Sequence, residues 1–122
     1  MLYPADPAFY AAWERWSPEL AKALLDTHTL GDVLDLLKSG DAQLWTDREA
    51  AVVTEIVIYP RKKVLRAWLA SGKYEGIRRI EDRVIPWAKD YGCQEIQIVG
   101  RLGWRRRLKD YRESAVTMTK EI

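Results

Sequence analysis

The chain contains one cysteine, one histidine and one phenylalanine in 122 residues. The single cysteine, Cys93, excludes an internal disulfide and fits a reducing compartment. The single histidine, His28, lies in no group of Cys, Asp or Glu at ligand spacing, so no metal site is predicted. No apolar run reaches the roughly 18 residues of a membrane span, and the start lacks the basic-then-apolar pattern of a secretory signal. We therefore expect no contact with a membrane.

Neither sign of charge dominates the composition. Lys and Arg total 20 against 18 for Asp and Glu, and the resulting net charge of +2 is too small to indicate nucleic acid by itself. The apolar content of 48% is enough for the core of one domain that spans residues 1–122. Six tryptophans beside many arginines suit a surface that a partner covers as well as a core.

Residues 1–40 have the patterns of amphipathic helices. Aromatic residues from Phe9 to Trp16 lie on one side of a first short helix. The segment Ser17-Pro18-Glu19 has a capping side chain ahead of a proline, which predicts that a second helix begins there. Thr29 is the predicted start of a third helix, and Gly40 is its predicted end.

From Ala42 the apolar residues recur with the period of strands. Residues 42–59 predict a hairpin whose second strand, with the apolar run 52–58, is covered on both faces. Residues 64–69 predict the next strand, which Ser71-Gly72 ends. A long helix over residues 74–91 follows, with Pro86 expected to kink or break it. No internal repeat or low-complexity segment interrupts this order.

The remaining elements are short. Residues 92–99 alternate apolar and polar side chains, which predicts a strand with one buried face. Residues 100–104 break that pattern, and a short helix that begins at Trp104 ends near Asp110. The alternation of residues 113–122 predicts a closing strand.

Six basic side chains lie within residues 101–112, and only Asp110 and Glu113 oppose them. They are Arg101, Arg105, Arg106, Arg107, Lys109 and Arg112. Such a cluster can bind the phosphates of DNA, RNA or a cofactor, because the guanidinium group matches phosphate geometry. The alternative is a solvated helix face that pairs with carboxylates of the long helix. No base-reading motif accompanies the cluster, so both interpretations stay open.

The string Trp-Ala-Lys-Asp-Tyr-Gly-Cys-Gln-Glu-Ile-Gln-Ile-Val-Gly-Arg-Leu-Gly-Trp, at residues 87–104, precedes the short helix and a segment that ends Lys-Glu-Ile. It resembles the C-terminal half of the GNAT superfamily of N-acetyltransferases. More closely, it is similar to small GNAT-like proteins of tailed bacteriophages, which include a minor internal virion protein and proteins described as antirestriction factors. The resemblance extends from about residue 49 to the end, and it implies a location in the host cytoplasm or in the virion.

For the fold, the resemblance implies an α/β domain with a GNAT-like mixed sheet flanked by helices. The expected order is N-terminal helices and then strand-strand-strand-helix-strand-helix-strand. In that family a turn of pattern Gln/Arg-x-x-Gly-x-Gly/Ala binds the diphosphate of acetyl-CoA at a helix N-terminus. Residues 69–76 read Leu-Ala-Ser-Gly-Lys-Tyr-Glu-Gly, so Ser71, Gly72 and Lys73 are the candidate cofactor residues. Because the second glycine does not fall at the motif's position and no Arg or Gln stands three residues before Gly72, we expect a degenerate site without acetyl-CoA. The alternative is a diverged loop that still binds it.

Acetyl transfer also needs a base and an acid. The resemblance offers Glu55 as the base, although a carboxylate in so apolar a run is equally explained by pairing with Arg66 on the next strand. The family's tyrosine acid is not matched within the short helix, and Tyr111 comes late for that role. We therefore expect a phage-type GNAT-like protein that acts by binding a protein or a nucleic acid. The alternative is an active acetyl-CoA-dependent N-acetyltransferase.

Overall fold

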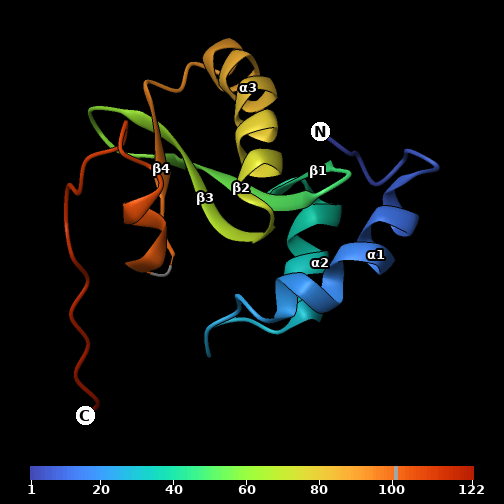
Figure 1. Ribbon diagram of the computed structural model, residues 1–122, viewed down its shortest axis with the longest axis horizontal. Coiled ribbons are helices and arrows are strands. Elements are labelled where there is room, and N and C mark those ends of the chain that lie inside the picture. The colour runs from blue at the N-terminus through green and yellow to red at the C-terminus, as the bar shows by residue number, and fades with distance from the viewer. Residues whose placement is uncertain (101) are drawn as a thin grey trace.

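The computed structural model describes residues 1–100 and 102–122. Two helices, α1 (Phe9–Ala21) and α2 (Leu30–Ser39), precede three strands: β1 (Gln43–Asp47), β2 (Ala50–Ile58) and β3 (Lys63–Gly72). The long helix α3 (Tyr74–Asp90) leads to β4 (Glu95–Ile98) and to the 3-10 helix η1 (Leu102–Arg106) (Figure 1). The predicted α/β architecture with a mixed sheet flanked by helices is confirmed.

The sheet has the strand order β1-β2-β3-β4, and only β3 and β4 run parallel. Helix α3 covers one face, while α1 and α2 cover the other (Figure 1). Successive residues of β2 point to opposite faces, so Val53 packs against α1 and α2 and Val52 packs below α3. The prediction that β2 is covered on both faces holds for its first half, whereas residues 55–58 are partly or fully exposed.

Helix α1 is continuous through Pro18, so the predicted second helix is wrong. Trp16 and Leu20 lie one turn apart on the buried face and keep the two turns packed, which offsets the hydrogen bond that the proline lacks. Helix α3 likewise continues through Pro86 as one element. Of the predicted kink or break, the break does not occur, because Val84 and Ala88 on either side of the proline are both buried.

Helix α2 begins and ends as predicted. The Thr29 side chain accepts a hydrogen bond from the N–H of Asp32 at 3.1 Å, and the Asp32 carboxylate accepts one from the N–H of Thr29 at 2.9 Å. Gly40 closes the helix in the left-handed region with φ of 85°. These local signals define both ends of α2.

Strand β3 is longer than predicted and contains a bulge. Val53 pairs with Leu69 and Thr54 pairs with Ala67, so Trp68 is an extra residue in β3. Both Trp68 and Leu69 therefore pack on the side of α1 and α2. Ser71 and Gly72, predicted to end the strand, belong to it and pair with Ala51 and Ala50.

The predicted closing strand is wrong, since residues 113–122 form no strand in the described chain. A strand needs a partner for its backbone groups, and this segment runs away from the sheet as an extended, exposed chain (Figure 1). At the other end, Leu2 forms an isolated antiparallel bridge with Leu44 that the sequence did not predict. Of the described helices, none has the length and apolarity to cross a membrane.

A candidate binding cleft between strands β3 and β4

Strands β3 and β4 separate halfway along β3. Their parallel pairing runs from Val64 to Ala67, and its last contact is the hydrogen bond that the N–H of Val99 donates to the carbonyl of Ala67 at 2.9 Å. The chain then turns away at Gly100. Residues 68–72 of β3 have no partner strand on this side among the described residues. The bulge at Trp68 lies where the separation begins, and a bulge adds local twist and bending. A cleft opens between the strands as a result.

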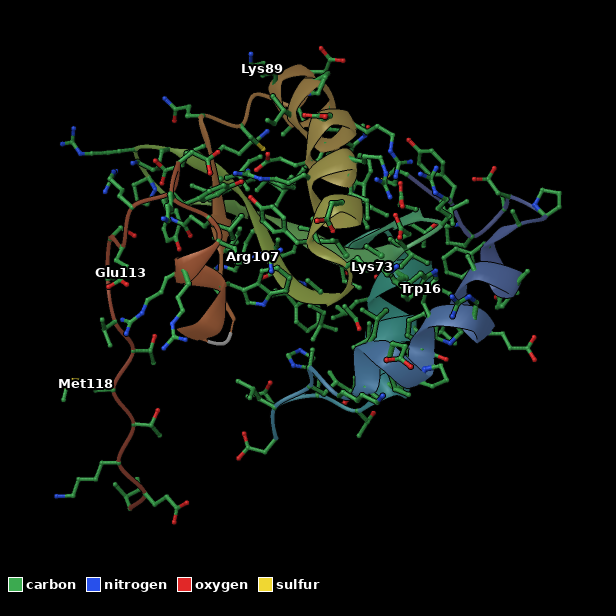
Figure 2. The ribbon with its side chains drawn as sticks, viewed as in Figure 1. Trp16, Lys73, Lys89, Arg107, Glu113 and Met118 are labelled. Carbon is green, nitrogen blue, oxygen red and sulfur yellow. The ribbon has the colours of Figure 1, made fainter. Side chains whose placement is uncertain are left out.

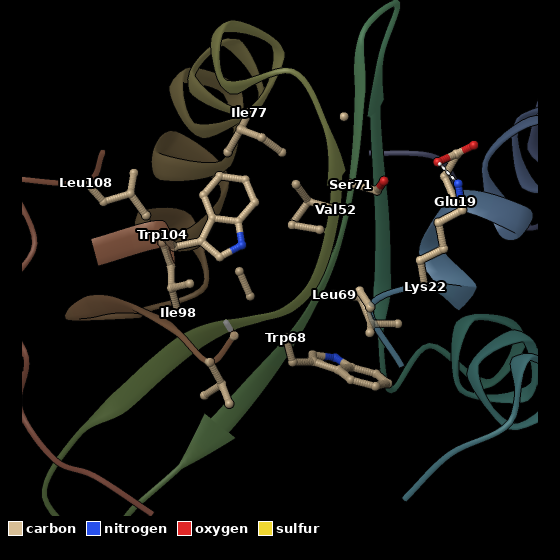
Figure 3. A pocket seen from close by; sticks show the side chains of 16 residues that line it. Glu19, Lys22, Val52, Trp68, Leu69, Ser71, Ile77, Ile98, Trp104 and Leu108 are labelled. Atoms are coloured by element: carbon tan, nitrogen blue, oxygen red, sulfur yellow. Dashed lines mark hydrogen bonds and ion pairs between the residues drawn. The ribbon is translucent and has the colours of Figure 1, made fainter. Parts of the chain in front are cut away.

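The cleft has a volume of about 300 Å³ and an apolar lining. Figure 3 shows the Trp104 indole facing Val52 and Ile77, with Ile98 and Leu108 beside it. Its remaining lining includes Leu69 and the small residues Ala67 and Ala70. At one end the Glu19–Lys22 ion pair of α1, at 3.2 Å, and the side chain of Ser71 add polar groups. Such a lining suits a bulky apolar group whose attached chain reaches the polar end.

The connection from β3 to α3 is a single residue, Lys73. Its backbone N–H donates to the carbonyl of Glu49 at 2.9 Å. Gly72 has φ of +113°, and a Cβ there would lie 2.1 Å from that same carbonyl oxygen and 2.6 Å from Cα of Ala50. Contact with the β1–β2 turn therefore accounts for the glycine, and one main-chain donor of the connection is already used.

Two carboxylates face the first turn of α3. Asp47 Oδ1 lies 3.2 Å from the position of a Cβ at Gly76, inside that turn. Arg79 donates to both Asp47 oxygens at 2.8 and 2.9 Å and to Glu49 at 2.6 Å. The Lys73 ammonium lies 3.1 Å from Glu49. The hydrogen bonds from Arg79 hold the pKa of Asp47 and of Glu49 below their ordinary values, so both stay ionised beside the positive end of the helix.

Glu55 and Arg66 are direct neighbours on β2 and β3, and their charged groups lie 3.5 Å apart. Arg66 also donates to the Tyr59 hydroxyl at 2.8 Å. The preceding residue, Thr54, accepts a hydrogen bond from Trp45 below α3, so Glu55 points to the opposite face of the sheet. Glu55 does not line the cleft. The geometry agrees with the pairing that the sequence offered as the alternative to a base.

Tyr111 follows η1 and donates its hydroxyl hydrogen to the Glu81 carboxylate on α3. Burial, this hydrogen bond and the nearby carboxylates raise the pKa of the Tyr111 phenol. Its neighbour Asp110 accepts two hydrogen bonds from Arg78 of α3, at 2.5 and 3.1 Å. Tyr111 does not line the cleft. In this arrangement it fastens the chain after η1 to α3.

The basic residues after β4 have different surroundings. Arg105 pairs with Glu113 at 3.3 Å, and the Arg107 guanidinium stacks 4.5 Å above the Tyr74 ring at the start of α3. Arg112 lies near enough to Glu95 to contribute to its lowered pKa, after Lys62 and Gln97. Arg106 and Lys109 are exposed and form no ion pair with a described residue, while Arg101 lies outside the described residues.

Several residues of the site escaped the sequence analysis. Trp104 was assigned only to a short helix, although its indole lines the cleft. The carboxylate pair of Asp47 and Glu49 was assigned to a turn, and its connection to Arg79 spans about 30 residues of sequence. Arg79 lies off the apolar stripe of α3, about one turn from the helix start. A cation so near the positive end of a helix indicates that carboxylates lie close to it, and this was the available sequence signal. The described residues contain no group of Cys, His, Asp and Glu that could hold a metal.

Comparison with solved structures identifies proteins of the same fold. TTHA1254 from Thermus thermophilus matches with a TM-score of 0.57 at 14% identity, over 89% of this chain and 92% of that one. A tetramutant of BH1408 from Bacillus halodurans matches with a TM-score of 0.57 at 16% identity, over 93% and 89%. A GNAT family acetyltransferase from Staphylococcus aureus gives 0.57 at 15%, over 91% and 93%. These likenesses establish a GNAT-like fold. No protein-family model matches the chain, and a comparison with curated proteins finds no match.

Proposed function

We propose that this protein is a binding module on a GNAT-like scaffold and that it transfers no acetyl group. In this proposal the cleft between β3 and β4 accepts a bulky apolar side chain from a partner protein. One observation carries the proposal: the cleft is open and apolar, while the neighbouring first turn of α3 already faces the carboxylates of Asp47 and Glu49.

The same turn disfavours acetyl-CoA. A diphosphate needs a group of free main-chain donors at a helix N-terminus. Here the connection is one residue long, its N–H is bonded to Glu49, and two anionic side chains stand beside the helix start. Lys73 and Arg79 are engaged with those carboxylates. The residues present therefore do not fit the diphosphate of coenzyme A.

The described lining of the cleft also lacks the groups that acetyl transfer uses. Glu55 and Tyr111, the two candidates by resemblance, lie elsewhere and have partners in Arg66 and Glu81. The only carboxylate among the described lining residues is Glu19, which pairs with Lys22. A base must come within hydrogen-bond reach of the proton it removes. The positions of these groups favour binding over catalysis.

The free edge of β3 suggests how a partner binds. Residues 68–72 are available for pairing with an added strand, and an extended segment placed there can direct one side chain into the cleft. Main-chain hydrogen bonds would supply affinity, and the cleft would select the side chain. The resemblance to phage internal virion and antirestriction proteins suggests that the partner is a virion or host protein, met in the host cytoplasm or the virion.

Two measurements test the proposal. In a thermal shift assay, 1 mM acetyl-CoA should leave the melting temperature unchanged, and a clear rise would refute the absence of cofactor binding. Selection from a library of extended peptides should enrich one bulky apolar residue in a constant position. Binding of the selected peptides should be lost in Ile98→Glu and kept in Leu25→Glu. Leu25 is 73% exposed and outside the cleft. Both variants replace an aliphatic side chain by glutamate, so they differ only in whether the changed residue lines the cleft. Equal binding by both variants would remove the cleft from the proposal.

An active N-acetyltransferase is the second candidate. The retained opening between β3 and β4 favours it, and release of free coenzyme A in the presence of an amine would establish it. A nucleic-acid partner would instead bind through the exposed side chains of Arg106, Lys109 and Arg112. If alanine at these three positions leaves duplex binding and its salt dependence unaltered, nucleic acid is not the partner.

A further inference from the structure

The C-terminal tail, residues 113–122, has the side-chain pattern of a half-buried strand but no strand partner in the described chain. Val116, Met118 and Ile122 are separated by even intervals, so they share one side of an extended chain, together with Lys120. Val116 is 79% exposed and Met118 90% exposed. Thr117, Thr119 and Glu121 occupy the other side. Large side chains repeated along one side of a strand are typical of a surface that is covered in use.

The sheet has an open edge of matching character. β4 is the last strand in the order and pairs only with β3 among the described residues. The backbone groups of alternate β4 residues therefore point away from the sheet without a partner strand. Its side chains divide by face, because Ile96 and Ile98 lie on the α3 side while Glu95 and Gln97 lie on the other. This edge contains neither proline nor a bulge, the usual features that prevent pairing.

The start of the tail is fixed to α3 and η1. Asp110 is bonded to Arg78, Tyr111 to Glu81 and Glu113 to Arg105. From there the tail leaves the body of the molecule, as the positions of Glu113 and Met118 show in Figure 2. The chain thus carries both an unpaired strand-like segment and an unpaired sheet edge that do not meet. Extended residues span about 3.3 Å each, so the ten-residue tail can reach a neighbouring molecule.

We propose that the tail adds as a strand to the β4 edge of a second copy of this chain, in a reciprocal dimer. A two-fold axis lets each copy supply one tail and one edge, so both unpaired features are satisfied at once. In the expected register Val116 and Met118 lie beside Ile96 and Ile98 and extend the apolar layer below α3. Thr117 then lies beside Gln97 on the polar face.

The test compares the whole chain with a chain that ends at Arg112. Light scattering after size-exclusion chromatography should give about twice the 14.2 kDa of one chain for the former and a single-chain mass for the latter. Met118→Pro should also be monomeric, because proline lacks the N–H of a ladder, whereas Met118→Leu should remain a dimer. All variants should keep the melting curve of the monomer's core, since the removed residues are exposed.

A fluorescent peptide of residues 113–122 supplies the second measurement. It should bind the shortened chain, and the same peptide with proline at position 118 should bind at least tenfold more weakly. The proposal fails if the whole chain is monomeric at 0.5 mM, or if the dimer survives removal of the tail. If hydrogen exchange finds the tail amides protected in such a monomer, the tail pairs with the β4 edge of its own molecule, and the proposal fails for that reason.

Discussion

Gly72 offers the sharpest test of how the turn before α3 is built. Gly72→Ala would place a Cβ 2.1 Å from the carbonyl oxygen of Glu49 and 2.6 Å from Cα of Ala50. Both atoms are backbone atoms, one in the β1–β2 turn and one in the first residue of β2, so no side chain can rotate to make room. The substitution must therefore move β3 away from that turn or leave a clash in place.

The loss of stability has two parts that a second glycine separates. An alanine at positive φ costs about 1–2 kcal/mol, and overpacking of a well-packed site adds about 1–3 kcal/mol. Gly40 has φ of +85° and no atom within 4 Å of a Cβ. Gly40→Ala should therefore lose only the first part, and Gly72→Ala about 2–5 kcal/mol in total.

Urea unfolding at 25 °C measures both variants against the unchanged chain, with slopes of about 1–3 kcal/mol per molar for a domain of this size. The difference between the two losses is the contribution of the clash. If Gly72→Ala is no more destabilising than Gly40→Ala, the turn does not pack as described. The explanation of Gly72 by packing, as opposed to phosphate binding, would then be lost.

Three further outcomes follow from named contacts. Arg79→Met should lower the melting temperature at pH 7, and the difference from the unchanged chain should shrink as the pH falls below about 4. The reason is that folding lowers the pKa of the Asp47 and Glu49 carboxylates, which therefore contribute stability that acid removes. A difference in melting temperature that stays constant with pH would contradict this. Tyr111→Phe should lower the free energy of unfolding by about 1 kcal/mol. In the unchanged chain Tyr111 should ionise at a higher pH than an ordinary tyrosine in an absorbance titration, since burial and Glu81 raise its pKa. Trp104→Ala should cost about 2 kcal/mol and increase the binding of an apolar dye to the cleft, and unchanged dye binding would remove Trp104 from its lining.

The elements that local signals define were predictable from the sequence. Thr29 and Asp32 form a capping box and Gly40 a left-handed cap, and all three act within α2 itself. The prediction of a new helix start at Pro18 was wrong, and so was the break that Pro86 offered beside a kink, for the opposite reason. A proline weakens a helix locally, but the buried residues on either side decide whether the helix continues, and their burial depends on the sheet.

The periodicity of apolar residues could not predict the cleft or the course of the tail. A bulge at Trp68 changes which face the following residues occupy, and alternation in one strand does not reveal what its neighbour does. The alternation predicted a strand for residues 113–122, yet a strand also requires a partner for its backbone groups. Tyr111, which precedes this segment, is bonded to Glu81 on α3.

In the proposed binding module, the acidic pair beside α3 takes the place of a phosphate. The positive end of a helix favours an anion. Here Asp47 at the end of β1 and Glu49 in the β1–β2 turn supply it, while Arg79 and Lys73 balance their charge. Replacing both by Asp47→Asn and Glu49→Gln would remove the two negative charges and leave Arg79 and Lys73 without ionic partners. The site would then combine a helix N-terminus with two free cations.

Inorganic diphosphate should therefore stabilise the double variant and not the unchanged chain. At ten times its dissociation constant a ligand contributes about 1.4 kcal/mol, which corresponds to a rise of about 5 °C in the melting temperature. Sodium chloride at equal ionic strength is the control for general screening. A rise of the same size in the unchanged chain would mean that the carboxylates do not block the helix start, and the argument against a diphosphate at this turn would fail.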